Sequence, residues 1–145
     1  MKVRTVYLTK RVDTEVTLQM SKALSPYELT PLQFAVLSFV DVDSPNFSSA
    51  QLSRRFAMTP QSMNEIVRIL LGKDLIIKTI DPAHKRILRL SLTESGKAIL
   101  AKCNAEINAV ERNLFGHLTE EEYNLYRLVM GKILEKARMD APTTA

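Results

Sequence analysis

The chain has 145 residues, 46% of them hydrophobic and 25% charged, and its 20 basic and 16 acidic residues give a net charge of +4. This length and composition predict one ordinary globular domain with a core and exclude a largely disordered chain. The single cysteine excludes an intramolecular disulfide, and the absence of Cys/His clusters predicts no metal or cofactor. No apolar stretch suits a signal peptide or a membrane span. We therefore expect a cytoplasmic protein with no membrane partner.

The first predicted element is a helix over residues 3–24, in which apolar residues recur at spacings of mostly three or four. Ser25-Pro26 ends it. Thr30 is a suitable N-cap for a second helix, because proline follows at the first helical position. The side of this helix expected to face the core carries Leu32, Ala35, Val36 and Phe39. A polar, proline-containing loop is expected over 41–46.

Two short helices and a hairpin are predicted next, over residues 48–93. Ser48 or Ser49 can cap the first helix, which runs to Phe56, and Thr59 can cap the second. The second helix carries a core-facing stripe of Met63, Ile66, Val67 and Leu70. Strands are expected over 75–80 and 87–92, joined by a charged turn. This order is typical of a winged helix-turn-helix, a DNA-binding unit.

The positive charge of the chain lies in this same segment. Residues 48–90 hold eight basic and three acidic residues, a net charge of +5, whereas the whole chain carries +4. The remainder is therefore slightly negative. A basic segment that coincides with a predicted helix-turn-helix indicates double-stranded DNA as a partner.

Two longer helices complete the chain. Thr93 can cap the first of them, and Thr119 with Glu122 forms the T-x-x-E pattern of a capping box for the second, which we expect to end near residue 138. The tail over 139–145 is expected to be disordered. The apolar stripe of the earlier helix is Ile99, Cys103, Ile107, Val110 and Leu114.

The predicted fold class is mainly α with a small β-wing (α+β), in a single domain over 1–145. Residues 30–93 form the winged helix-turn-helix lobe, and residues 1–25 and 94–138 form long flanking helices. A winged helix does not need these helices, so their apolar faces predict a homodimer interface. The alternative is that they fold back on their own domain.

The second helix of a helix-turn-helix enters the major groove with its N-terminal residues leading. Side chains such as Gln and Asn can pair with adenine, and Arg with guanine. Glu65 can accept a hydrogen bond from cytosine or hold an arginine in place. The simplest alternative is a solvated helix face. The residues that we expect to contact bases from this helix are Gln61, Ser62, Asn64 and Arg68, with Thr59 at its start.

Contacts with phosphates are expected from the preceding helix, where Arg54 and Arg55 lie and where Ser48 and Ser49 form the N-terminus. One of these arginines could instead form a structural ion pair. The wing tip carries His84, Lys85 and Arg86, and a basic hairpin tip can enter the minor groove, where arginine is favoured. His84 could be a spacer, a phosphate contact or a cap for the turn.

Three segments together resemble the MarR family of bacterial transcription regulators: LTPLQFAVL at 29–37, the helix-turn-helix at 48–73 and DPAHKRILRLSLTESG at 81–96. The family pattern has LT-x-x-Q, a wing D-P-x-D-x-R and LT-x-x-G. This chain supplies Leu29, Thr30 and Gln33, then Asp81, Pro82 and Arg86, then Leu92, Thr93 and Gly96.

The resemblance implies an obligate homodimer of triangular shape, with its first, fifth and sixth helices at the interface. It also implies winged helices that bind a pseudo-palindromic site. Many members of the family release DNA when they bind a small, often aromatic or anionic, effector, or when a cysteine is oxidised.

Two positions depart from the family pattern. His84 stands where the wing usually has Asp, which would orient the tip arginine, so Arg86 is either less preorganised here or oriented by Asp81 instead. Asp74 stands where Gly is favoured before Leu75. Aspartate tolerates a left-handed backbone better than most residues, so we expect the turn to survive.

Cys103 has two interpretations: a small buried hydrophobic residue, or a redox sensor, which would need an exposed thiolate near positive charge. No catalytic motif is visible, so we do not expect an enzyme. The favoured function is a dimeric, sequence-specific DNA-binding regulator, most simply a repressor, whose affinity a ligand modulates. The alternatives are a winged-helix protein-interaction module without sequence-specific DNA recognition, and a DNA-binding regulator without a ligand. The sequence identifies no ligand-binding residue.

Overall fold

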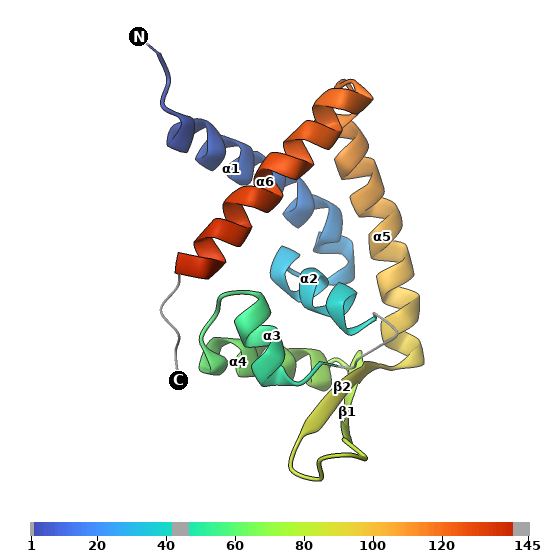
Figure 1. Cartoon of the computed structure of the whole chain (residues 1–145). Helices are drawn as coiled ribbons and strands as arrows, with labels where there is room; N and C mark the ends of the chain where they lie inside the picture. The colour runs from blue at the N-terminus through green and yellow to red at the C-terminus, as the bar shows by residue number, and fades with distance from the viewer. Residues whose placement is uncertain (1, 42–46, 141–145) are drawn as a thin grey trace. The chain divides into compact units, whose positions relative to one another are not determined.

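The computed structural model describes residues 2–41 and 47–140, which are helical apart from one hairpin (Figure 1). In chain order the elements are α1 (Thr5–Leu24), a 3-10 turn η1 (Ser25–Tyr27), α2 (Pro31–Val40), α3 (Ser49–Arg55), α4 (Pro60–Gly72), β1 (Ile76–Ile80), β2 (Leu88–Leu92), α5 (Glu94–Phe115) and α6 (Glu120–Asp140). The predicted mainly α class with a β-wing is confirmed. Helix α6 continues to Asp140, beyond its predicted end. The remainder of the expected tail, 141–145, and most of the expected loop, 42–46, lie outside the described residues.

The chain divides after Val110 into two compact units, of which the first contains every element from α1 to most of α5. Its core brings together residues from each of these elements. Side chains that are almost completely buried include Leu24 of α1, Leu37 of α2, Leu52 of α3, Met63 and Leu70 of α4, Ile76 of β1, Leu90 of β2 and Cys103 of α5. The helix-turn-helix and the wing therefore share one core.

The predicted caps of the three short helices are confirmed. The Thr30 hydroxyl accepts the backbone N–H of Gln33, and the Gln33 side chain accepts the N–H of Thr30, which forms a capping box at the start of α2. Ser48 and Gln51 do the same for α3. The Thr59 hydroxyl accepts the N–H of Ser62 at the start of α4.

The predicted buried face of α2 was partly wrong. Phe34, Val36, Leu37 and Val40 are buried, whereas Leu32 is 38% exposed. Helix α2 is apolar on nearly every side, so spacing alone does not identify the face that meets the core. The stripe predicted for α4 is confirmed, because Met63, Val67 and Leu70 are buried and Ile66 packs partly against them.

The turn from α4 into the wing uses the left-handed backbone expected at Asp74, whose φ is 60°. Strands β1 and β2 then pair antiparallel, from Ile76 opposite Leu92 to Ile80 opposite Leu88. Next to this turn, Thr93 donates its N–H to the Leu75 carbonyl at 3.1 Å and its hydroxyl to the Asp74 carbonyl at 2.6 Å. These bonds fix the start of α5 against the base of the wing.

The second unit contains the end of α5 and all of α6. The ring of Phe115 packs against Tyr123 and Tyr126, with centroids 6.1 and 5.7 Å apart. The predicted capping box is confirmed, since Glu122 accepts the N–H of Thr119 at 2.9 Å and Thr119 accepts the N–H of Glu122 at 3.2 Å. None of the helices described has the length and apolarity needed to cross a membrane.

Candidate nucleic-acid interface

The polar face of α4 is exposed along its whole length while the opposite face packs into the core. The residues on this face are those expected to contact bases, and Gln61, Ser62, Asn64, Glu65 and Arg68 are all exposed. Thr59 is also exposed, but its hydroxyl caps the helix and donates to Ser62 Oγ at 2.9 Å. The core stripe on the opposite side fixes the rotation of α4, so this polar face is presented to solvent as a unit.

Glu65 lies close to Arg68, with Oε1 3.8 Å from Nη2. Both side chains are well exposed, at 65% and 77%. A surface ion pair of this kind contributes little to stability, about 0–1 kcal/mol, and a nucleic acid can displace it at low cost. The structure therefore places Glu65 beside an arginine, one of the two roles expected for it, and leaves Arg68 available.

Asn64 forms a hydrogen bond with α3, the helix that precedes α4 in the chain. Its Oδ1 accepts the hydroxyl of Ser49, at the start of α3, at 2.5 Å. A bidentate contact with adenine needs both the carbonyl and the amide of an asparagine. This bond holds the carboxamide of Asn64 in one orientation, while the second lone pair of Oδ1 and the amide donors stay available to a base.

Arg54 and Arg55 are exposed on α3. The Arg55 guanidinium lies over the ring of Phe39, 5.2 Å from its centroid, and this contact holds the side chain against α2. Within residues 2–41 and 47–140 neither arginine forms an ion pair. The hydroxyl of Ser48, by contrast, is engaged in the cap of α3.

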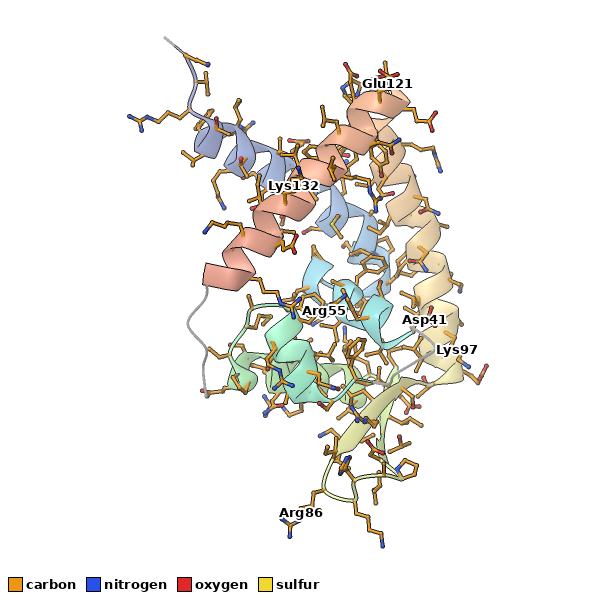
Figure 2. All side chains as sticks on the ribbon, in the orientation of Figure 1. Asp41, Arg55, Arg86, Lys97, Glu121 and Lys132 are labelled. Atoms are coloured by element: carbon orange, nitrogen blue, oxygen red, sulfur yellow. The ribbon has the colours of Figure 1, made fainter. Side chains whose placement is uncertain are left out.

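The wing projects from the first unit, and Arg86 extends from its tip away from the helices (Figures 1 and 2). His84, Lys85 and Arg86 are all exposed. The tip is closed by backbone bonds, since Ile87 donates to the His84 carbonyl at 2.9 Å and His84 donates to the Asp81 carbonyl at 3.2 Å. His84 is therefore part of the turn through its backbone.

Of the two alternatives for Arg86, direct pairing with the Asp81 carboxylate is not what the structure shows. Oδ2 of Asp81 lies 2.8 Å from Nη2 of Arg89, and no carboxylate in the described part of the chain pairs with Arg86. The Ala83 N–H and then the Arg89 guanidinium lower the pKa of Asp81 below its ordinary value of 3.8. Antiparallel pairing of the strands brings Arg89 back beside Asp81, eight residues earlier.

Arg89 is the residue of this region that sequence reasoning missed. In the sequence it had no role beyond one of the eight basic charges of residues 48–90. A signal was present, because an arginine near the start of the second strand of a hairpin and an aspartate just after the first strand can meet across the turn. Its second partner, Gln51, is distant in sequence and gives no local signal.

Cys103 is completely buried in the core of the first unit. Burial, followed by the charge of Glu106, raises the pKa of its thiol. A raised pKa and lack of exposure disfavour the thiolate, so the structure favours the interpretation of Cys103 as a small hydrophobic residue. His, Cys, Asp and Glu side chains in the described ranges form no group of three or more that could hold a metal ion.

The sequence of this chain is similar to a known family and to known proteins. Residues 27–87 match the sequence model of the MarR family. The HTH-type transcriptional repressor Rv2887 of Mycobacterium tuberculosis is 30% identical to this chain over 127 residues, which cover 88% of this chain and 91% of the repressor.

Solved structures share the fold. Rv2887 in complex with DNA has a TM-score of 0.71 and 28% identity, over 91% of this chain and 98% of that chain. Rv2887 in complex with p-aminosalicylic acid has a TM-score of 0.69 and 28% identity, over 90% and 98%. The Staphylococcus aureus MepR–DNA complex has a TM-score of 0.82 and 20% identity, over 93% and 99%, and shows a likeness of fold.

Proposed function

This chain belongs to the MarR family, and from that premise we propose that it is a dimeric repressor that binds a pseudo-palindromic DNA site and responds to a small effector. The relative Rv2887 is a transcriptional repressor, so we place this chain among regulators rather than enzymes. Because its proposed target is chromosomal DNA, we expect this protein to act in the cytoplasm.

The observation that carries the proposal is the surface formed by α4 and the wing. An exposed polar helix face and an exposed basic tip lie on one unit with one core. The segment that forms them has a net charge of +5 in a chain of +4. We assign Gln61, Ser62, Asn64 and Arg68 to base contacts, Arg86 to the minor groove, and Ser48, Ser49, Arg54, Arg55, Thr59 and Lys85 to positioning on the backbone.

The proposed dimer rests on apolar surface at the two ends of the chain. Helix α1 exposes large apolar side chains along its length, and so does α6. Exposed apolar area of this extent is unusual on a monomer and typical of an interface. The side chains that we expect a second copy to cover are Val6, Tyr7, Leu8, Leu18, Leu125, Leu128, Ile133 and Leu134.

The proposed effector is a small aromatic anion, because the relative Rv2887 was solved with p-aminosalicylic acid. A ligand that binds the DNA-free protein more tightly than the DNA-bound protein lowers the affinity for DNA. At saturation, the factor is the ratio of the ligand's affinities for these two states. Titrating a preformed protein–DNA complex with p-aminosalicylate and salicylate, with benzyl alcohol as the uncharged control, tests this class. No displacement by either anion at millimolar concentration would remove the class from the proposal.

Fluorescence anisotropy with the DNA upstream of this gene, and with a shuffled duplex of the same composition, tests the function. We expect binding to the upstream DNA to be at least about 1,000-fold tighter than to the shuffled duplex, and weaker at higher salt. Arg86→Ala should weaken binding to both duplexes and reduce the salt slope by about one unit. Lys102→Ala, which removes one exposed charge from α5, is the control and should bind as the parent does. Equal affinity for the two duplexes would refute the proposal and favour a protein-interaction module.

A further inference from the structure

One side chain, Arg89 of β2, joins the wing to α3. Its Nε and Nη2 atoms donate to Oδ2 of Asp81 at 2.9 and 2.8 Å, and its Nη1 atom donates to Oε1 of Gln51 at 2.7 Å. The side chains of Arg89 and Asp81 are only 21% and 11% exposed. Because a guanidinium presents its donors in a rigid planar fork, one arginine can bind both acceptors in a single defined orientation.

Gln51, the residue of α3 that Arg89 contacts, is itself held in place by the cap of the helix. Oε1 of Gln51 also accepts the backbone N–H of Ser48 at 2.9 Å, and the N–H of Gln51 donates to Ser48 Oγ at 3.2 Å. Gln51 is therefore part of the α3 capping box and cannot follow a movement of Arg89 without breaking the cap. In the same place, the N–H of Leu90 donates to the carbonyl of Phe47 at 3.0 Å.

Asp81, the residue of the wing that Arg89 contacts, holds the turn that carries Arg86. Oδ1 of Asp81 accepts the N–H of Ala83 at 2.8 Å. The N–H of Asp81 donates to the carbonyl of Ile87 at 2.9 Å, on the other side of the turn. The orientation of the tip is thus linked through Asp81 and Arg89 to α3, although Arg86 has no ion-pair partner of its own among the described residues.

We propose that Arg89 is a positioning residue for DNA binding: it holds the wing tip at a fixed place relative to α3, so that Arg86 meets the groove in a preorganised wing. A wing that is ordered before binding loses less conformational entropy on binding, which raises affinity without a new contact. The inference rests on the proposed function, since it assigns a role within the same DNA interface. It adds Arg89, Asp81 and Gln51 as residues that act through Arg86.

A double-mutant cycle tests the proposal. Arg89→Lys preserves the charge, but a single ammonium cannot bind Asp81 and Gln51 in the same geometry. We expect this substitution to weaken binding to the upstream DNA about five- to tenfold in the parent, and less than about twofold when Arg86 is already alanine. The control cycle combines Arg89→Lys with Ser62→Ala on α4, where the two losses should multiply.

An equal loss with and without Arg86 would mean that Arg89 acts on general stability or contacts phosphate directly, and would overturn the proposal. Asp81→Asn, which keeps the shape of the side chain and loses the ion pair, should show the same dependence on Arg86, and independence from Arg86 would count equally against it.

A measurement without DNA separates this proposal from the proposed function. Arg89→Lys should speed hydrogen exchange at the amides of Ala83 and Ile87 in the free protein and leave that of Val67 in α4 unchanged. Unchanged exchange at the wing would overturn the proposal. Failure of the proposed function would appear instead in the parent, as equal affinity for upstream and shuffled DNA.

Discussion

The hydrogen bond between Ser49 and Asn64 orients a side chain of α4 that we propose contacts a base. An asparagine whose carboxamide Ser49 holds in one orientation loses less conformational entropy when it pairs with adenine. Ser49→Ala should release the carboxamide and reduce the preference for adenine at that base pair by roughly 1 kcal/mol. Binding to duplexes that carry each of the four base pairs at every position measures the shift.

Ser62→Ala is the matched control for this change. It removes a hydroxyl from the same exposed surface but does not touch the carboxamide of Asn64. It should therefore weaken binding without an adenine-directed change at the same base pair. An unchanged base profile in Ser49→Ala would show that the hydrogen bond has no part in recognition.

Asp81 gives the wing a predictable response to acid. Its pKa is lowered by the Ala83 N–H and by Arg89, so its carboxylate stabilises the fold above the unfolded-state pKa of about 3.9. That contribution is lost as the pH falls through the lowered pKa of the folded state. Urea unfolding of the parent and Asp81→Asn should show the parent more stable at about pH 7, and the difference should shrink as the pH falls below the unfolded-state value. A constant difference over this range would contradict the assignment.

The candidate site could be predicted from sequence only where one element determines it. The exposed face of α4 follows from the core stripe on its other side, so Gln61, Asn64 and Arg68 were identified correctly as exposed. The partners of these side chains could not be predicted. Ser49 is 15 residues from Asn64, and Gln51 is 38 residues from Arg89. Only the packing of α3 against α4 and β2 brings these pairs together.

At the scale of elements, the start of α5 lies against the base of the wing at Gly96. A Cβ on this residue would lie 2.0 Å from the carbonyl oxygen of Leu75. Backbone must move to relieve such a contact, so Gly96→Ala should destabilise the protein by about 2–4 kcal/mol. Chemical denaturation measures this loss.

Gly72 is the matched control, since a Cβ there meets nothing within 4 Å. Gly72→Ala should leave stability within about 0.5 kcal/mol or raise it slightly. Similar stability of both variants would show that the close approach of α5 to Leu75 is not a constraint.

Local chemistry also explains which elements the sequence predicted well. Thr30, Ser48 and Thr59 each cap a helix through atoms within three residues, so their positions mark the helix starts directly. The left-handed backbone of Ala57, with φ 50°, was not foreseen, because alanine carries no preference for it. The buried face of α2 depends on which neighbours surround the helix, and its sequence is apolar on nearly every side.

At the scale of the whole molecule, the exposed apolar faces of α1 and α6 predict that the working species is a dimer. Ile133 is 62% exposed on α6, and a glutamate there would place an unpaired charge in an apolar interface. Ile133→Glu should convert the dimer to a monomer and reduce DNA affinity, because two linked half-sites bind far more tightly than one. Light scattering coupled to size-exclusion chromatography measures the mass.

Glu135→Ala supplies the comparison, since it changes a charge on the same helix without adding one to the apolar face. It should remain dimeric. A parent protein that is monomeric at micromolar concentration would contradict the proposed interface, whatever the effect of either substitution.

A hydroxyl-radical footprint on the DNA upstream of this gene, made with the parent and with Arg86→Ala, tests DNA recognition by α4 and the wing most directly. We expect the parent to protect two related half-sites whose centres lie about one helical turn apart. Arg86→Ala should lose protection first in the minor groove beside each half-site, where the wing tip is expected to lie. Absent or uniform protection by the parent, at concentrations where it is folded and dimeric, would contradict the account.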